Sequence, residues 1–283
     1  MTGVIEIRED VTLDPAAAPV LYRSKTMTET TLSCIDAHRT FSGGGKTAGY
    51  SANDTLKDLA YNDSVATILG DAAYDGGGVK FTTTPPASGS PLINLPDEFY
   101  LPATCKKVLL NLWVKVPAVY DTQGAAGPRQ ILGVAKGAES PATSNPANYH
   151  IGVLYNCNSA GRLATLQLNA FGAQVSSNAL AAVQAQAGKV VHLALYAYAS
   201  ASNKVVIRAY VNGVAFADQT TTTDWSVPTG ANSRASVGNR NLVTGFNIEY
   251  TFYRAMINDL TSSNEDVSAL VLREYNGNKE NFS

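Results

Sequence analysis

The amino-acid sequence predicts an all-β protein built as an antiparallel β-sandwich, and three observations support this prediction. From Lys106 onward, runs rich in β-branched and aromatic residues follow one another and are separated by turn residues. Three such runs meet in residues 188–218, where Asn212-Gly213 separates the last two and is the strongest short signal of a hairpin. Apolar residues make up 45% of the chain and charged residues only 16%, a bias common in β-rich extracellular and virion proteins.

Length and charge limit this interpretation further. A chain of 283 residues is long enough for one large sandwich with an attached arm. Its net charge of -2 argues against broad electrostatic binding of nucleic acid or anionic membrane. No apolar run approaches the ~20 residues of a membrane helix, and residues 1–14 lack the features of a secretory signal. We therefore expect synthesis in the host cytoplasm without a signal peptide and no membrane insertion.

Residues 1–40 show no sustained helix or strand period and are predicted to form an N-terminal arm, with residues 41–283 forming the sandwich. Pro15 and Pro19 interrupt the apolar residues of this arm, which indicates a hinge between two short extended pieces. Exposed apolar side chains usually mark an interaction surface. The arm is therefore predicted to dock or to mediate oligomerisation through residues 1–24.

The segment after the arm contains a run of glycines before Lys46 and Thr47. A phosphate-binding loop would need a further glycine where Thr40 stands, so a glycine-rich surface loop is the preferred interpretation. Residues 53–69 are predicted to hold a short helix capped by Asn53 or Asp54, with one apolar face formed by Leu56, Leu59 and Ala60.

Asp71 and Asp75 lie in the next loop and are weak candidates for calcium ligands, but the spacing of a calcium-binding loop is missing. Solvated loop acids are the preferred interpretation, and no cofactor other than calcium is considered. Residues 79–84 are predicted to form an edge strand. Residues 82–96 contain four prolines and are predicted to cross the fold as an extended segment.

The strands predicted after Lys106 form a regular series. In residues 106–117 a shared core face is expected for Leu110, Leu112, Val114 and Val116, while Leu109 and Trp113 fall on the opposite face. The further predicted strands are residues 129–135, 149–156, 162–172, 190–199, 204–211, 214–218, 234–239 and 247–259. Residues 179–187 are alanine-rich and are predicted to be a helical turn or a loop. Ser262–Glu265 reads as a capping box that opens a helix over Glu265–Tyr275, with Val267, Leu270 and Val271 toward the core.

Two sequence patterns resemble laminin-G-like and concanavalin A-like jelly rolls. One is the strand pair that ends Tyr210-Val211-Asn212-Gly213, and the other is Val237-Gly238-Asn239 followed by a loop, a long strand and a short helix. The resemblance covers about residues 106–275 and implies a jelly-roll β-sandwich. That fold hosts lectins, glycosidases, polysaccharide lyases and structural modules, so it does not specify an activity.

Catalytic groups are hard to find in this sequence. Glycosidases need two carboxylates beside the sugar, but the strand 247–259 carries Glu249 as its one acid before the terminal Asp259, and the acid pattern of glycosidases on this fold is missing. His150 and His192 lie inside strands, where a packed histidine is expected more often than a catalytic base. Cys34, Cys105 and Cys157 are far apart in sequence and are predicted to be reduced, buried thiols. The sequence therefore predicts a protein without enzymatic activity.

Carbohydrate binding remains a hypothesis, because sugar sites combine an aromatic ring with amide and carboxylate groups. Three loops supply such groups, and their candidate residues are Trp225 with Asp224, Tyr120 with Asp121, and Asn239, Arg240 and Asn241. For Trp225 the preferred alternative is a loop anchor packed against the sandwich.

The function predicted from the sequence is that of a phage or prophage virion protein, in the tail or associated with the capsid, which mediates assembly or attachment. Its expected partners are copies of itself and other virion proteins, with bacterial surface glycan as a further ligand and no nucleic acid. The first alternative is a carbohydrate-binding lectin module, and the second is a polysaccharide-degrading enzyme on the same fold.

Overall fold

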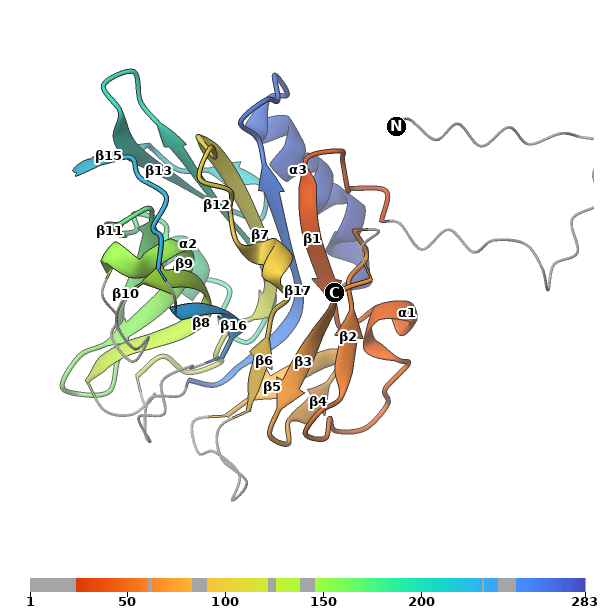
Figure 1. Ribbon diagram of the computed structural model, residues 1–283. Helices are drawn as coiled ribbons and strands as arrows, with labels where there is room; N and C mark the ends of the chain where they lie inside the picture. Colours follow the sequence, from red (N-terminus) through yellow and green to blue (C-terminus); the bar gives the residue numbers. More distant parts are fainter. Residues whose placement is uncertain are drawn as a thin grey trace, which may run out of the picture.

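The computed structural model describes residues 24–60, 63–82, 91–121, 126–137, 146–230, 232–238 and 248–282. These residues form two antiparallel sheets packed face to face (Figure 1), so the predicted β-sandwich is confirmed. Residues 1–23, which include most of the predicted arm, lie outside the described part of the chain.

The nine-stranded sheet has the order β14-β13-β12-β7-β17-β5-β4, with β1 also paired to β17 and β15 to β13. Its strands are β1 (Thr31–Asp36), β4 (Ala73–Asp75), β5 (Gly78–Phe81), β7 (Lys107–Lys115), β12 (Val190–Ala199), β13 (Lys204–Val211), β14 (Val214–Ala215), β15 (Gln219–Asp224) and β17 (Tyr250–Asp259).

The eight-stranded sheet has the order β11-β10-β9-β8-β16-β6-β3-β2. Its strands are β2 (Thr55–Lys57), β3 (Val65–Leu69), β6 (Leu92–Asn94), β8 (Gly127–Gly137), β9 (Tyr149–Cys157), β10 (Leu163–Ala170), β11 (Ala173–Ser176) and β16 (Asn232–Val237). The helices of the described residues are short except for α3, and they are α1 (Thr40–Gly43), η1 (Asp97–Phe99), η2 (Pro146–Asn148), α2 (Leu180–Gln184), α3 (Val267–Asn278) and η3 (Lys279–Asn281).

Strand alternation places the core between the two sheets. Leu110, Leu112 and Val114 of β7 point into the main core, whereas Leu109 and Trp113 point to the outer face of the nine-stranded sheet. The hairpin predicted at Asn212-Gly213 is present, with φ of 50° and 81° at its two central residues, as a type I′ turn requires. The sequence therefore specified both faces of β7 correctly.

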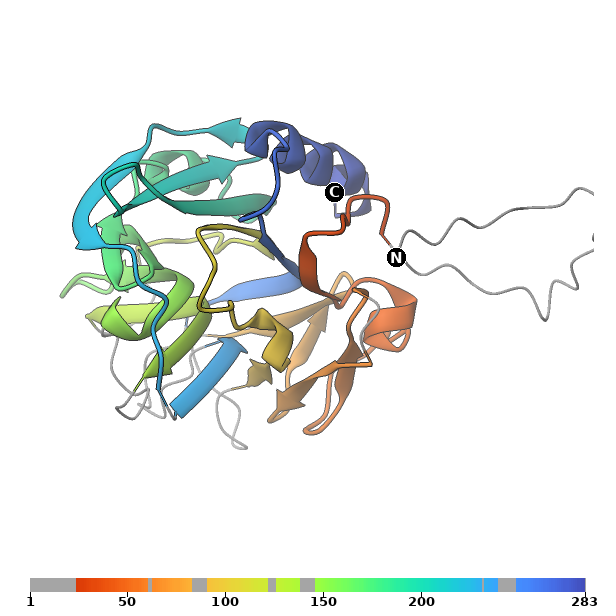
Figure 2. The same ribbon diagram turned by 45° about the horizontal axis from the view of Figure 1, so that its top comes forward.

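Helix α3 covers the outer face of the nine-stranded sheet (Figure 2), where Leu270 and Val271 pack on Leu109, Ala194 and Tyr210. The predicted helix is confirmed, but the predicted capping box is wrong. Asp266 is the N-cap, and its Oδ1 accepts hydrogen bonds from the backbone N–H groups of Ser268 (2.7 Å) and Ala269 (3.3 Å). The helix begins at Val267 because an aspartate cap satisfies the free N–H groups of its first turn.

The helix predicted in residues 53–69 is wrong, because this segment forms β2 and β3. In β3, Ala66 and Ile68 are buried while Val65 and Leu69 are exposed, which is the alternation of a strand with one covered face. The predicted edge strand near residue 79 is also placed wrongly, since β5 lies between β4 and β17.

The predicted boundary at residue 40 falls inside the sandwich. Strand β1 pairs along β17 in antiparallel register from Thr31↔Asn258 to Asp36↔Arg254. The described part of the predicted arm, residues 24–40, is therefore integrated into the nine-stranded sheet.

The three cysteines are free and buried, as predicted. Both strand histidines are also buried and hydrogen-bonded, His150 to Leu101 and Pro228 and His192 to Asn111. Across the described residues, no helix has the length and apolar character needed to cross a membrane.

Candidate functional site

Trp225 is buried and does not offer its ring to a ligand. Its indole stacks on Phe171 with 3.8 Å between ring centroids, and its Nε1 donates a hydrogen bond to the carbonyl oxygen of Cys105 at 2.8 Å. The neighbouring Asp224 carboxylate is exposed and pairs with Lys204 at 2.7 Å. The sugar-platform interpretation of Trp225 is therefore corrected in favour of a loop anchor, because the ring is buried against Phe171 and its N–H group is bonded inside the protein.

The second predicted pair lies elsewhere. Tyr120 packs edge-on against Tyr155 with centroids 6.1 Å apart, and the exposed Asp121 pairs with Arg162 at 2.7 Å. Trp225 is hydrogen-bonded to Cys105, which precedes β7, whereas Tyr120 follows β7. The strand between them is about 30 Å long, so the two predicted pairs lie near its opposite ends. The third group, formed by Asn239, Arg240 and Asn241, lies outside the described residues.

The two calcium candidates have protein partners. Asp71 Oδ1 accepts a hydrogen bond from the N–H of Ala52, and Asp75 Oδ2 accepts from Lys115 Nζ (3.0 Å) and Thr251 Oγ1 (2.9 Å). The Lys115 ammonium therefore occupies a position that a cation would take beside Asp75. Within the described ranges, no group of three or more His, Cys, Asp or Glu side chains is placed to hold a metal ion.

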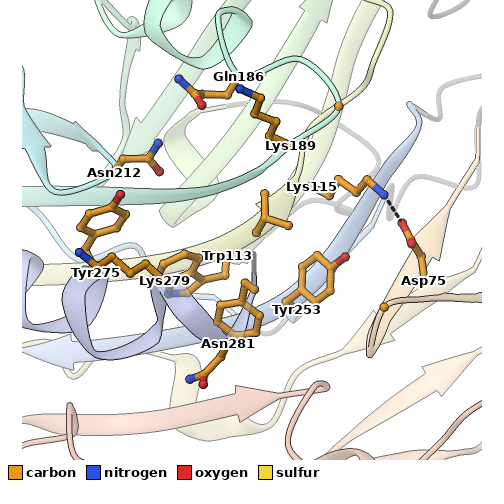
Figure 3. A pocket seen from close by; sticks show the side chains of 14 residues that line it. Asp75, Trp113, Lys115, Gln186, Lys189, Asn212, Tyr253, Tyr275, Lys279 and Asn281 are labelled. Atoms are coloured by element: carbon orange, nitrogen blue, oxygen red, sulfur yellow. Dashed lines mark hydrogen bonds and ion pairs between the residues drawn. The ribbon is translucent and has the colours of Figure 1, made fainter.

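A pocket of about 560 Å³ opens on the outer face of the nine-stranded sheet, where α3 ends. Trp113 lies at its centre and polar side chains surround it (Figure 3). The lining combines four aromatic rings with amide, ammonium and carboxylate groups. These residues come from β4, β7, β12, β17, α3, η3 and two loops, and they include Asp75, Trp113, Lys115, Gln186, Lys189, Asn212, Tyr253, Tyr275, Lys279, Asn281 and Phe282.

Strand register creates the row of side chains under the pocket. Trp113 of β7 stands opposite His192 of β12 on one side and Arg254 of β17 on the other. Two residues further along, Lys115 stands opposite Val190 and Thr251. Period-two alternation keeps Trp113 and Lys115 on the same outer face, so β7 supplies both an aromatic ring and a charge to one site.

A β-bulge in β17 brings Tyr253 into the pocket. The register shifts between Phe252, which faces the core opposite Val114, and Arg254, which faces outward opposite Trp113. Tyr253 is the extra residue and also faces outward, packed on Trp113 and Phe282. A bulge leaves one residue unpaired and redirects its neighbours, so two consecutive side chains, Tyr253 and Arg254, lie outside the core.

The aromatic rings form the floor and one wall of the pocket. Trp113 lies parallel to Tyr275 at 6.0 Å between centroids and close to Phe282 at 4.9 Å, and Tyr253 lies 5.4 Å from Phe282. Trp113, Tyr253 and Phe282 are buried, whereas Tyr275 is half-buried. Tyr275 is therefore the ring that a ligand reaches most readily.

A buried ion network fixes the floor from below. Trp113 Nε1 donates to Glu274 Oε1 at 3.0 Å, and the same oxygen accepts from Arg254 Nε at 2.8 Å. Arg254 also donates to Asp36 of β1 at 2.8 Å. Burial alone would raise the pKa of Glu274, but the Arg254 charge acting together with smaller contributions, including hydrogen bonds from Thr26 and Arg254, lowers that pKa overall. Glu274 therefore remains ionised and holds the indole in place, with β1, β17, α3 and β7 joined at one point.

On the opposite side, Asn212 is oriented by the backbone. Its Oδ1 accepts the N–H of His192 at 3.0 Å, which leaves the amide Nδ2 group available to donate toward a ligand. Burial lowers the pKa of His192 to about 4. The imidazole next to Trp113 is therefore uncharged at neutral pH.

The charges at the pocket are unequal. Lys115 and Asp75 form an ion pair at 3.0 Å. Burial acts to raise the pKa of Asp75, but its hydrogen bonds with Lys115 and Thr251, together with the neighbouring lysine charges, lower that pKa overall. Lys189 and Lys279 are exposed and form no ion pair with any carboxylate of the described residues. Lys279 Nζ lies 5.6 Å from the centre of the Tyr275 ring. The pocket therefore carries an excess of positive charge.

This arrangement is suited to binding a polar ligand against an aromatic surface. Asp75 is the single carboxylate among the described lining residues, and it is already paired. Glu249, the acid noted in the sequence, pairs with Lys80 at 3.3 Å.

This pocket is not evident from the sequence. The sequence predicts Trp113 on the outer strand face and Asp75 in a loop, but no sequence pattern connects the two. The relevant signal was present in Trp113-x-Lys115, an aromatic and a charged residue on one face of a strand expected to be covered on both sides. The lining residues from α3 and η3 had no comparable signal, because the sequence did not show where the helix would lie.

Comparison with known proteins supports the fold. No protein-family model and no curated protein matches the sequence. Among solved structures, the Trypanosoma rangeli sialidase in complex with sialic acid aligns over 90% of this chain and 34% of its own, with a TM-score of 0.51 and 13% identity.

The binding domain of botulinum neurotoxin DC in complex with rat synaptotagmin II aligns over 88% of this chain and 51% of its own, with a TM-score of 0.53 and 10% identity. A structure described as showing that cell entry of botulinum neurotoxin type C depends on two ganglioside molecules has a TM-score of 0.54 at 10% identity. The chain thus spans about a third of the sialidase and about half of the toxin chains. At these identities the likeness establishes a shared β-sandwich fold.

Proposed function

We propose that this chain is a glycan-binding module without enzymatic activity, and that its ligand binds in the pocket at the end of α3. The observation that carries the proposal is the composition of the pocket. Sugar rings present apolar C–H faces and polar hydroxyl edges, so their sites pair an aromatic ring with amide and charged groups. Tyr275 supplies the accessible ring, and Gln186 and Asn212 supply amides at the rim.

The carboxylates of the pocket support binding over hydrolysis. A glycosidase of the common type needs a general acid and a second carboxylate a short distance apart. Asp75 has its carboxylate paired with Lys115, and Glu274 is buried beneath Trp113 and held by Arg254. We therefore expect no release of reducing ends from bacterial polysaccharides.

The structural neighbours are compatible with this proposal. One was solved with sialic acid, and another concerns a toxin whose cell entry depends on gangliosides. Their similarity to this chain is limited to the fold, so they support a carbohydrate-binding sandwich as a class and leave the ligand to be identified.

We also propose, from the sequence, that the module serves a phage or prophage particle. Low charge and the apolar residues within residues 1–24 favour self-association or docking on another virion protein. A glycan site would then contribute to attachment at a bacterial surface. Recovery of the chain from purified particles would test this assignment.

Glycan-array screening followed by calorimetry tests the main proposal. Tyr275→Ala should weaken binding of the selected glycan at least tenfold, because it removes the half-buried ring. Gln186→Ala should weaken it less. Tyr198→Ala is the matched control, since Tyr198 is another half-buried tyrosine on the nine-stranded sheet that packs beside α3 but does not line the pocket.

Unfolding midpoints of all three variants show whether a loss of binding reflects a loss of fold. A folded Tyr275→Ala variant that binds glycans with the parent affinity would contradict the proposed site. A protein that binds no glycan on the array would contradict the proposed function.

A further inference from the structure

We infer that the pocket selects an acidic sugar, one that carries a carboxylate or a sulfate, and that Lys189 and Lys279 bind the anionic group. This inference rests on the proposed function and specifies its ligand class.

The first step is the charge of the pocket. Of its three lysines, Lys115 is neutralised by Asp75, whereas Lys189 and Lys279 form no ion pair within the described residues. Two uncompensated ammonium groups at one pocket favour a ligand with negative charge. A neutral sugar would leave both ammonium groups without an anionic partner.

The second step is the balance of donors and acceptors. Asn212 Oδ1 is occupied by the N–H of His192, so the group that this side chain offers is its Nδ2 donor. Asp75 Oδ2 already accepts hydrogen bonds from Lys115 and Thr251. With the two ammonium groups, the charged donors of the pocket outnumber its one carboxylate, and the remaining acceptors are neutral oxygens such as those of the Gln186 and Asn281 amides. A carboxylate or sulfate is acceptor-only and fits that balance.

The third step is the position of Lys279. Its Nζ lies 5.6 Å from the centre of the Tyr275 ring, at the end of α3 where η3 begins. This ammonium group lies over the ring, so a sugar that stacks on this face would displace it toward the ring edge, where it can reach an anionic substituent of the sugar. Lys189 enters from the loop before β12, on another side of Trp113 (Figure 3).

The experiment is a calorimetric titration with three probes that share one core: lactose, sialyllactose and sulfated lactose. We expect an acidic probe to bind at least tenfold more tightly than lactose. Raising sodium chloride from about 50 to 500 mM should weaken the acidic probe several-fold and lactose little, because salt screens exposed charges.

The double variant Lys189→Gln with Lys279→Gln should lose the preference for the acidic probe and retain lactose binding. The double variant Lys204→Gln with Lys136→Gln is the matched control. Both lysines lie outside the pocket lining, and their replacement removes the same number of positive charges. The preferred acidic probe identifies the anionic group as carboxylate or sulfate.

Equal affinity for lactose and both acidic probes, unchanged in the double variant, would overturn the inference and leave a neutral-glycan module. Failure of every probe to bind, together with a blank glycan array, would overturn the proposed function as well. Loss of acidic binding in the control variant to the same extent would show a general charge effect and would also overturn the inference.

Discussion

The two tryptophans show how a side chain's surroundings decide its role. Both are buried, but Trp113 lies under an open pocket, whereas Trp225 closes a loop over the core. Trp225 ties the segment after β15 to the residue before β7 through its bond to Cys105. Its contribution is therefore to stability, and that of Trp113 is to the floor of the proposed site.

Replacing Trp225 separates these roles. Trp225→Ala should lower the free energy of unfolding by about 3–5 kcal/mol, since it removes a fully packed aromatic side chain. Trp225→Phe keeps the stacking on Phe171 and loses the hydrogen bond, so it should cost less. Urea denaturation measures both losses. Glycan affinity of the Trp225→Phe variant should equal that of the parent, and a weakened affinity would restore Trp225 to the binding site.

Among the buried residues, His150 makes stability depend on pH. Its Nδ1 accepts the N–H of Leu101 and its Nε2 contacts the Pro228 carbonyl, so the folded state holds a neutral ring. Burial, with a smaller contribution from Lys136, lowers its pKa to about 4, against about 6.5 in an unfolded chain. Between those values the unfolded state binds the additional proton. This contribution is complete above pH 6.5 and is lost as pH falls toward 4.

The expected loss is on the order of a few kcal/mol between pH 7 and pH 4. Chemical denaturation of His150→Gln at several pH values should give a flatter dependence in this window, from a lower starting stability. The exposed His38→Gln variant serves as a control for removing one imidazole. A His150→Gln curve parallel to the parent curve would show that other groups account for the acid sensitivity.

At the scale of elements, the bulge in β17 and the end of α3 together build the site. Strict alternation through Phe252, Tyr253 and Arg254 would direct Arg254 into the core. The bulge instead lets Arg254 meet Asp36 of β1 and Glu274 of α3 outside the core, where all three side chains are almost fully buried. This network holds the helix end against the sheet and so positions Tyr275 and Phe282.

Arg254→Met should destabilise the protein by about 3–5 kcal/mol, because two carboxylates would remain buried without their counter-charge. Arg162→Met is the matched control, since its pair with Asp121 is exposed and should be worth at most about 1 kcal/mol. Thermal and urea unfolding measure the difference. Comparable losses in the two variants would show that the network contributes little.

At the scale of the whole molecule, the chain folds as a sandwich whose first and last strands are paired. β1 lies beside β17 although more than 200 residues separate them, so the described residues from 24 onward form one folded unit. Because of this pairing, a truncation that ends before β1 should leave the sandwich intact, whereas one that removes β1 should destabilise it.

Deleting residues 2–23 should leave the unfolding midpoint close to that of the full chain, because every contact described above is retained. Deleting residues 2–40 should unfold the sandwich or expose the edge of β17, since β1 and its Asp36 are lost. Circular dichroism and thermal unfolding test both. If residues 1–23 mediate assembly, the shorter deletion should also lower the mass measured by light scattering; an unchanged mass would contradict that proposal.

The sequence by itself determined the local structure wherever one segment carried enough information. Alternating residues defined both faces of β7, Asn212-Gly213 defined a hairpin, and the apolar positions of α3 defined its buried side. Only the tertiary structure decided the pairing of β1 with β17, the bulge at Tyr253 and the pocket at the end of α3. Each of these depends on residues distant in sequence meeting in a particular register, and a strand's alternation does not specify its partner. The paired charges of Arg254, Asp36 and Glu274 therefore read as separate surface residues in the sequence and become a buried network in the fold.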